Sequence, residues 1–211
     1  EICACLVGSE MCIRDSCLPS KTNPGVMAED YASIRAVVRE YNRLAGTSDT
    51  TLTPKDICDI ADGKRPGNAA AARESFRLFG EAAGDAMATA VTLTDSLIVV
   101  GGGLTGAARY IMPGLLAQLR STIHTINGEQ LQRVQMSVFD LDDEAEFARF
   151  VKGDARQLKV YGSDRTVTYD PMKRTGVIIS KLGASKAISI GAYTYALSQI
   201  DKANQACGEE A

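Results

Sequence analysis

The sequence predicts an α/β protein, because helical patterns alternate with short apolar runs of the kind that form buried strands. The clearest of these runs, residues 97–100, ends in a glycine triplet and leads into another helical pattern. Of the 211 residues, 45% are hydrophobic, which suffices for a buried core. The formal net charge is −3 and basic residues are mixed with acidic ones, so we expect no nucleic-acid partner.

Three helices are predicted ahead of the glycine triplet. The second begins at Thr53 and the third at Asn68, since both residue types are good N-caps. In the third helix Gly80 and Gly84 lie one turn apart, which lets another backbone approach closely. The first helix starts near residue 28, and its apolar face comprises Tyr31, Ile34, Val37, Val38, Tyr41 and Leu44.

Strands and helices continue to alternate after the triplet. The run 97–100 is continuous, so we expect it to be buried on both faces. A helix bent at Pro113 follows and carries His124, the only histidine, as a surface or packing residue rather than a catalytic one. The remaining predicted elements are a strand at 134–141, a charged helix at 142–153, a hairpin at 156–170, a strand or loop at 175–183 and a closing helix at 185–200.

The acidic cluster around residue 142 favours a structural role. Its members stand between the predicted strand and the charged helix, where acids act as caps rather than metal ligands. They are Asp140, Asp142, Asp143 and Glu144.

Four of the six cysteines lie in residues 1–17, which have no helical or strand period. A metal site has weak support, because no C-x₂-C pair and no nearby histidine are present. A signal peptide is disfavoured by the missing basic and apolar regions. The alternative is that these residues are not native: residues 8–16, GSEMCIRDS, resemble a translated sequencing-library adaptor.

The compartment follows from the remaining cysteines and the hydropathy. Cys58 and Cys207 stand alone, which is typical of a reducing cytoplasm rather than of a disulfide framework. No apolar run approaches the roughly 18 residues that cross a bilayer, so we expect no membrane span.

The stretch VVGGGLTG is the strongest physical signal of a binding site. Gly101, Gly102 and Gly103 have no side chains, so a ligand can lie against their backbone, and the next helix directs N–H groups toward it. Phosphate or ribose oxygens suit this place. Two alternatives stay open: a glycine turn that only packs a helix on a strand, and a Rossmann-type NAD-dependent oxidoreductase. The latter lacks the acidic residue expected about 20 positions later.

The order of these motifs resembles the second half of ROK-family sugar kinases. The resemblance rests on three stretches: AEDYASIRAV, then FGEAAGDAMA followed by an apolar strand and GGG, and finally LGASKAISIGAYTYAL. It implies a mixed-sheet C-terminal lobe of an actin-like ATPase (ribonuclease H-like) fold, incomplete here, over residues 28–203. Residues 1–27 would be a non-native or disordered leader, and residues 204–211 a frayed tail.

The same resemblance implies a function and its residues. The parent would transfer the γ-phosphate of ATP, with Mg²⁺, to a hexose, with glucose as the default. Glu29 matches the family glutamate that contacts sugar hydroxyls, although it could instead be a first-turn acid of the following helix. The glycine triplet, Leu104 and Thr105 match the nucleotide side; Thr105 could hydrogen-bond the ligand or cap the next helix.

The sequence departs from the family pattern in two respects. Val26 and Met27 stand where many members carry the last Gly-Cys of a zinc knuckle, so we expect no zinc. The Asp-x-Gly-Gly-Thr phosphate loop and the Asn-Asp pair with the general base are also missing, which predicts a fragment that is inactive alone. A non-catalytic ROK-type sugar-sensing transcriptional regulator remains an alternative, and a homodimer is compatible with the resemblance.

Overall fold

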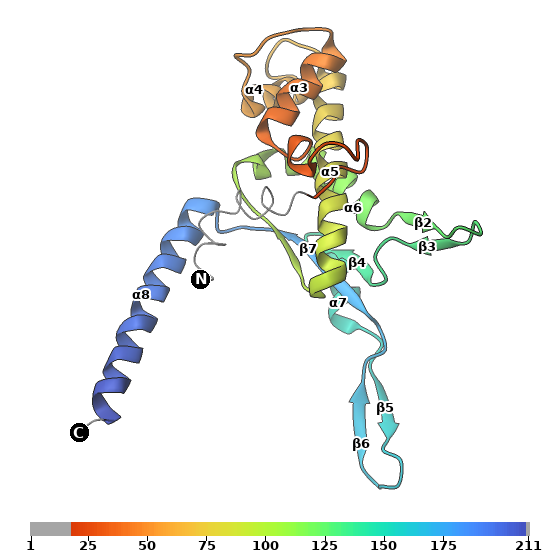
Figure 1. Cartoon of the computed structure of the whole chain (residues 1–211), viewed down its shortest axis with the longest axis vertical. Coiled ribbons are helices and arrows are strands. Elements are labelled where there is room, and N and C mark those ends of the chain that lie inside the picture. Colours follow the sequence, from red (N-terminus) through yellow and green to blue (C-terminus); the bar gives the residue numbers. More distant parts are fainter. Residues whose placement is uncertain (1–17, 210–211) are drawn as a thin grey trace.

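The computed structural model describes residues 18–209, and Figure 1 shows a helical end, a small sheet, two protruding hairpins and a helix that stands apart. The helices are α3 (Ile34–Ala45), α4 (Pro54–Ala61), α5 (Ala69–Thr94), α6 (Ala108–Leu119), α7 (Glu144–Lys152) and α8 (Ala184–Glu209), with the 3₁₀ turns η1 (Ala28–Asp30) and η2 (Gly103–Ala107). The strands are β1 (Ile98–Val100), β2 (Thr122–His124), β3 (Gln130–Gln132), β4 (Ser137–Asp140), β5 (Arg156–Lys159), β6 (Thr166–Tyr169) and β7 (Arg174–Ile179). This mixture confirms the predicted α/β class.

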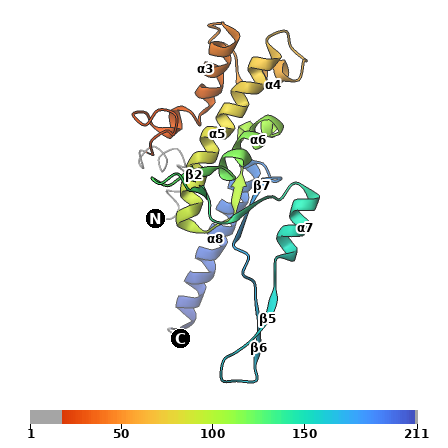
Figure 2. The same ribbon diagram turned by 90° about the vertical axis from the view of Figure 1, so that its right-hand side faces the viewer.

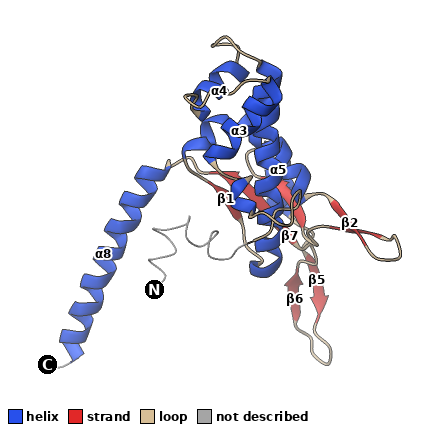
Figure 3. Cartoon of the chain, turned by 45° about the horizontal axis from the view of Figure 1, so that its top comes forward, coloured by secondary structure: helices blue, strands red, loops and turns tan. Residues whose placement is uncertain are grey.

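The helical end comprises α3, α4 and the first half of α5 (Figure 3). The predicted caps are confirmed: Thr53 forms a reciprocal capping box with Asp56, and the Asn68 side chain accepts from the Ala71 amide at 3.1 Å. The predicted start of the first helix is wrong, because Ser33 caps α3 and the chain before it forms η1. Consequently Ile34 stands at the helix tip and is 58% exposed.

Helices α5 and α6 pack backbone to backbone, as the two glycines of the third predicted helix indicated. A Cβ on Gly84 would stand 2.7 Å from the Leu115 carbonyl oxygen, and one on Gly80 would overlap the Ile111 carbonyl oxygen. Gly114 of α6 faces Arg77 of α5 in the same way. The two helices therefore form a rigid spine that links the helical end to the sheet (Figure 1).

The three-stranded sheet has the order β1-β7-β4, and both pairings are parallel. One face packs on α5 and α6 through a cluster that includes Val177, Leu115 and Val91. The prediction that residues 97–100 are buried on both faces is wrong within the described chain, since Val99 is 63% exposed. The physical reason is that β1 is an edge strand and only the face carrying Ile98 and Val100 meets the helices.

The predicted long helix after the glycines ends early. It stops at Leu119, and residues 122–132 form the hairpin β2–β3, so His124 pairs with Gln130 in a strand instead of lying on a helix. The turn contains Asn127 followed by Gly128 at φ +84°, a sequence that favours tight hairpin turns. This local signal outweighed the helical spacing of the apolar residues.

The C-terminal third extends away from the body. The predicted hairpin is confirmed as β5–β6, and Figure 2 shows it and α8 reaching beyond the sheet. Helix α8 continues to Glu209, past the start of the frayed tail expected at residue 204. No helix among residues 18–209 combines the length and apolar character needed to cross a membrane.

Residues 18–27 pack on the body. Pro19 and Met27 form an antiparallel bridge, and the Lys21 ammonium donates to the Gln118 amide oxygen at 3.1 Å. Ser20 is buried. These residues belong to the folded part rather than to the leader expected over residues 1–27, and residues 1–17 lie outside the described part of the chain.

Candidate functional site

The glycine loop, defined here as Gly101–Thr105, runs from the end of β1 into the turn η2 at the end of the sheet. The Ser180 amide, just after β7, donates to the Val100 carbonyl at 2.8 Å and so holds the start of the loop against the neighbouring strand. Gly102 has φ +105° and ψ −177°, a conformation that side-chain-bearing residues rarely adopt. The sequence therefore needs glycine at Gly102 for the turn itself.

Packing among the described residues does not explain the other glycines of this stretch. A Cβ added at Gly103 or Gly106 would meet no atom within 4 Å, and one at Gly101 would only touch the Ser180 Cβ at 3.7 Å. These positions contrast with Gly80, where a helix fills the space. The loop thus leaves its backbone open on one side.

Thr105 and Leu104 fix the loop from within. The Thr105 hydroxyl donates to the Gly102 carbonyl at 2.8 Å, and the Thr105 amide approaches the same oxygen at 3.2 Å. Neither η2 nor α6 receives a side-chain cap, so the alternative that Thr105 caps the following helix is wrong. Leu104 is half-buried against the cluster of the helical end. Thr105 braces the turn.

An ionic anchor, defined as Asp62, Lys64, Arg109 and Tyr110, ties the start of α6 to the end of α4. Asp62 accepts from the Tyr110 hydroxyl at 2.8 Å, from the Lys64 ammonium at 2.7 Å and from the Arg109 guanidinium. Arg109 also donates to the Gly106 carbonyl at 3.1 Å. Because Arg109 lies one residue into α6, the anchor positions the glycine loop relative to the helical end.

The anchor also sets the charge state of Asp62, whose side chain is 11% exposed. Hydrogen bonds from Lys64, Arg109 and Tyr110, in that order of effect, hold the pKa of this carboxyl well below its usual range. A carboxyl with a depressed pKa in the folded state stabilises the fold above its unfolded pKa of about 3.9 and loses that contribution as the pH falls.

We expect Asp62→Asn to lower the melting temperature at pH 7 and to flatten its decline between about pH 5 and pH 2. The amide keeps the shape but removes the charge that three donors share. Thermal unfolding across this pH range measures both effects. Asp164→Asn is the control, because Asp164 is fully exposed in the β5–β6 turn; equal effects of the two substitutions would contradict the role of the anchor.

Glu29 lies in η1, outside α3. Its backbone carbonyl accepts from the Ala32 amide at 3.1 Å, and the next residue, Asp30, accepts through its backbone from Arg39 at 2.9 Å. Glu29 is a first-turn acid of η1 but not of α3, because Ser33 separates it from that helix. No described side chain forms a hydrogen bond or ion pair with the Glu29 carboxylate.

The turn that carries Glu29 borders a hollow of about 520 Å³ between residues 20–22, α3, α5 and α6. The hollow is lined by Ala28 and Tyr31 on either side of Glu29, with Asp85 and Gln118 on the opposite elements. Glu29 is not part of this lining, and no hydrogen bond or ion pair among residues 18–209 joins it to the glycine loop. The described contacts therefore do not join the two candidate groups.

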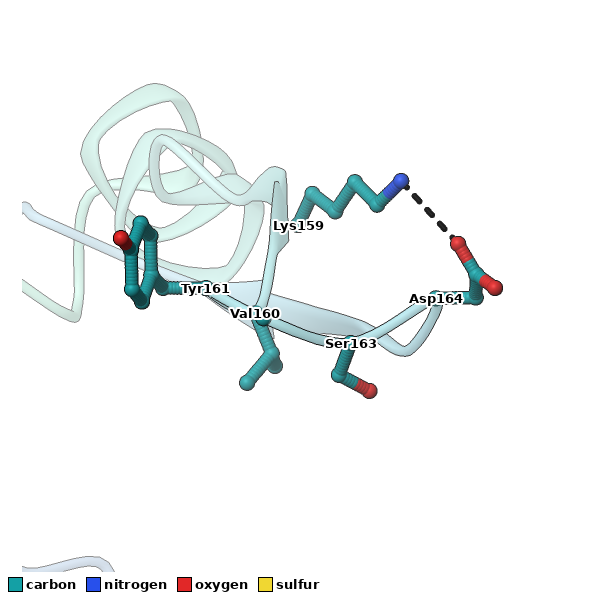
Figure 4. Close-up of a pocket in the computed structure, with 6 residues that line it drawn as sticks. Lys159, Val160, Tyr161, Ser163 and Asp164 are labelled. Atoms are coloured by element: carbon teal, nitrogen blue, oxygen red, sulfur yellow. Dashed lines mark ion pairs between the residues drawn. The ribbon is translucent and has the colours of Figure 1, made fainter.

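A second hollow, of about 540 Å³, lies at the turn of hairpin β5–β6 (Figure 4). All its lining residues belong to one segment, residues 159–164, and the ion pair between Lys159 and Asp164 spans it at 3.2 Å. Tyr161, one of these lining residues, is fully exposed. Since a single turn cannot enclose a ligand, this hollow is open surface.

The acidic cluster is used for structure, as its position between a strand and a helix indicated. Asp143 caps α7 by accepting from the Glu146 amide at 2.8 Å, and Asp142 accepts from the Ile179 amide at 2.8 Å. Asp140 accepts from the Asp142 amide at 3.0 Å. The ionic anchor was not predicted from the sequence. The available signal was an aspartate followed by Gly63 and two basic residues, just before the long helix.

These features define a class of protein: an α/β fold in which a parallel strand ends in an open glycine turn at the start of a helix, as in actin-like ATPases. Residues 22–145, more than half of the chain, match the ROK family, and the chain belongs to this family. The predicted resemblance to the ROK family is therefore confirmed. The family match excludes the Rossmann alternative, and the sheet order agrees: β4, the next parallel strand after α6, pairs with β7 and not with β1.

One solved structure provides a close comparison. The crystal structure of glucokinase from Parabacteroides distasonis ATCC 8503 superposes with a TM-score of 0.77 at 46% sequence identity, over 86% of this chain and 49% of that chain. The chain therefore spans about half the length of this relative. No curated protein matches the chain.

Proposed function

We propose that this chain contributes the nucleotide-side loop and a sugar-binding glutamate of an ATP-dependent hexose kinase of the ROK family. The open glycine loop carries the proposal, because it leaves backbone N–H groups free of side chains next to a helix start. The glucokinase relative favours a kinase over the sugar-sensing regulator that the family resemblance also allows. Glucose is the first hexose to test for the same reason.

The glycine loop and the ionic anchor of this chain together offer a place that suits the phosphates of ATP. Gly101, Gly102 and Gly103 admit the nucleotide, Thr105 keeps the turn closed, and the ionic anchor fixes the helix behind it. When bound, ATP supplies the phosphoryl group and Mg²⁺ neutralises its phosphates. We assign no magnesium ligand, because residues 18–209 contain no group of three acidic, histidine or cysteine side chains suited to a metal.

Gly103→Val is expected to weaken binding of a non-hydrolysable ATP analogue at least tenfold. Gly103 has an ordinary φ and open space around its Cβ position, so valine fits the fold while covering the backbone that the ligand needs. Titration calorimetry with the magnesium complex of the analogue measures the affinity, and NMR amide shifts locate the loop.

Gly191→Ala is the matched control, since it also adds a side chain at an open glycine, but in α8. Equal affinities for wild type, Gly103→Val and Gly191→Ala would overturn the nucleotide role of the loop. Analogue binding with no shift at residues 101–105 would do the same.

A further inference from the structure

Glu29 directly follows a loop that backbone hydrogen bonds close on itself. The Ala28 amide donates to the Leu18 carbonyl at 2.7 Å, and the Ser20 amide donates to the Val26 carbonyl at 2.8 Å. We call residues 18–28 the entry loop. Because the first of these bonds ends at the residue before Glu29, the entry loop fixes the backbone on the N-terminal side of Glu29.

Lys21 ties the entry loop to α6 and α5. Its ammonium donates to the Gln118 amide oxygen at 3.1 Å, and Gln118 is only 8% exposed. The Gln118 amide nitrogen donates in turn to the Asp85 carboxylate of α5 at 3.5 Å and to the Ser121 hydroxyl at 3.4 Å. Since the backbones of α5 and α6 are in contact, Lys21 attaches the entry loop to a rigid part of the fold.

Arg39 of α3 holds the chain on the other side of Glu29. Its guanidinium donates to the Asp30 carbonyl at 2.9 Å and lies 5.0 Å from the centre of the Tyr31 ring. The negative face of an aromatic ring attracts a cation placed above it. Arg39 therefore contacts both residues that follow Glu29, one through a hydrogen bond and the other through a cation–π contact.

These contacts fix the backbone on both sides of Glu29 but do not use its carboxylate. No described side chain forms a hydrogen bond or ion pair with that carboxylate. A group that is held in place before a ligand arrives loses less conformational freedom on binding, so its contribution to affinity is larger. The arrangement therefore suits a carboxylate that accepts hydrogen bonds from a ligand.

We propose that Arg39 and Lys21 are positioning residues for Glu29. They hold the turn η1 so that the Glu29 carboxylate meets the sugar, and they do not contact the sugar themselves. The inference rests on the proposed sugar role of Glu29. It gives a function to two basic side chains that exposure alone would class as ordinary surface residues, since the Arg39 side chain is 48% exposed.

Hydrogen exchange followed by NMR tests the hold on the turn without any ligand. The Tyr31 and Ala32 amides both donate to the Ala28 carbonyl at 3.0 Å and report on η1. Arg39→Met should speed their exchange about fivefold while the amides of α5 keep their rates. Arg35→Met is the matched control, because Arg35 is exposed on α3 one turn earlier and should leave these amides unchanged.

Lys21→Met tests the N-terminal side of the turn in the same measurement. Exchange of the Ala28 amide should become about fivefold faster, because the entry loop loses its contact with Gln118. Lys55→Met is the matched control, since Lys55 is an exposed lysine of α4. For either side of the turn, exchange equal to that of the control variant would overturn the proposal.

Glucose titration distinguishes positioning from direct contact with the sugar. It uses a single chain that joins this sequence to the part of the P. distasonis glucokinase that it does not match, called the unmatched part. Arg39→Met should weaken glucose binding about tenfold and leave the affinity for an ATP analogue unchanged. In the Glu29→Gln background the same substitution should have no further effect, because Arg39 acts only through Glu29.

Two titration results would also overturn the proposal. One is an unchanged glucose affinity of Arg39→Met, and the other is full additivity of Arg39→Met and Glu29→Gln, which would mean that Arg39 contacts the sugar itself. Failure of the proposed function looks different. Intact glucose binding in Glu29→Gln would remove the sugar role of Glu29, and the positioning role with it, even if exchange in Arg39→Met still showed the hold on the turn.

Discussion

Gly80→Ala is expected to lower the free energy of unfolding by about 2 kcal/mol, although alanine is the better helix former. The added Cβ would overlap the Ile111 carbonyl oxygen and stand 3.1 Å from the Leu115 amide nitrogen. Both atoms belong to the backbone of α6, which cannot rotate aside as a side chain can. Helices α5 and α6 must therefore separate, and the contact of Gly114 with Arg77 opens with them.

Urea unfolding measures the change as a lower midpoint at an unchanged slope. Gly191→Ala is the matched control, because Gly191 also lies within a helix but has no atom within 4 Å of its Cβ position. It should cause no loss of stability. If both substitutions changed stability equally, helix propensity rather than the close approach of α5 and α6 would explain the glycine.

The elements that could be predicted from the sequence are those set by neighbouring residues. The caps at Thr53 and Asn68, the close approach at Gly80 and the hairpin β5–β6 each depend on a few adjacent side chains. The start of α3 is also set by neighbouring residues. The apolar pattern begins before Ser33 and predicted an earlier start, but the helix begins after Ser33 because this residue caps it.

Burial was harder to predict because it depends on distant partners. The apolar run at 97–100 indicates a strand, but only the surrounding elements decide which faces are covered, and here Val99 remains exposed. The ionic anchor was missed for the same reason. Asp62 and Arg109 are 47 residues apart, and neither shows a local pattern that pairs them.

The candidate site was predictable in part. The glycine triplet indicated a turn with an accessible backbone, and the open space around Gly103 supports that interpretation. The sequence could not show that Thr105 turns inward to Gly102, nor that Glu29 occupies a separate turn ahead of α3. Both depend on where the chain changes direction, which single-residue preferences determine poorly.

Glu29→Gln is expected to weaken glucose binding about 100-fold. A carboxylate can accept from two neighbouring hydroxyls, and each charge-assisted hydrogen bond contributes about 1.5–3 kcal/mol. Glutamine keeps the length of the side chain but loses the charge and replaces one acceptor with a donor. Titration calorimetry of the chain with glucose, alone and together with the unmatched part of the glucokinase, measures the loss.

Asp30→Asn is the matched control, because it makes the same chemical change one residue away, where the described hydrogen bonds use backbone atoms and not the carboxylate. A structural role for Glu29 would instead appear as a lower melting temperature. We expect none, since no described side chain pairs with its carboxylate and the helix dipole of α3 begins beyond Ser33. Loss of glucose affinity at unchanged stability therefore assigns Glu29 to the ligand, whereas equal affinities for both variants would remove it from the site.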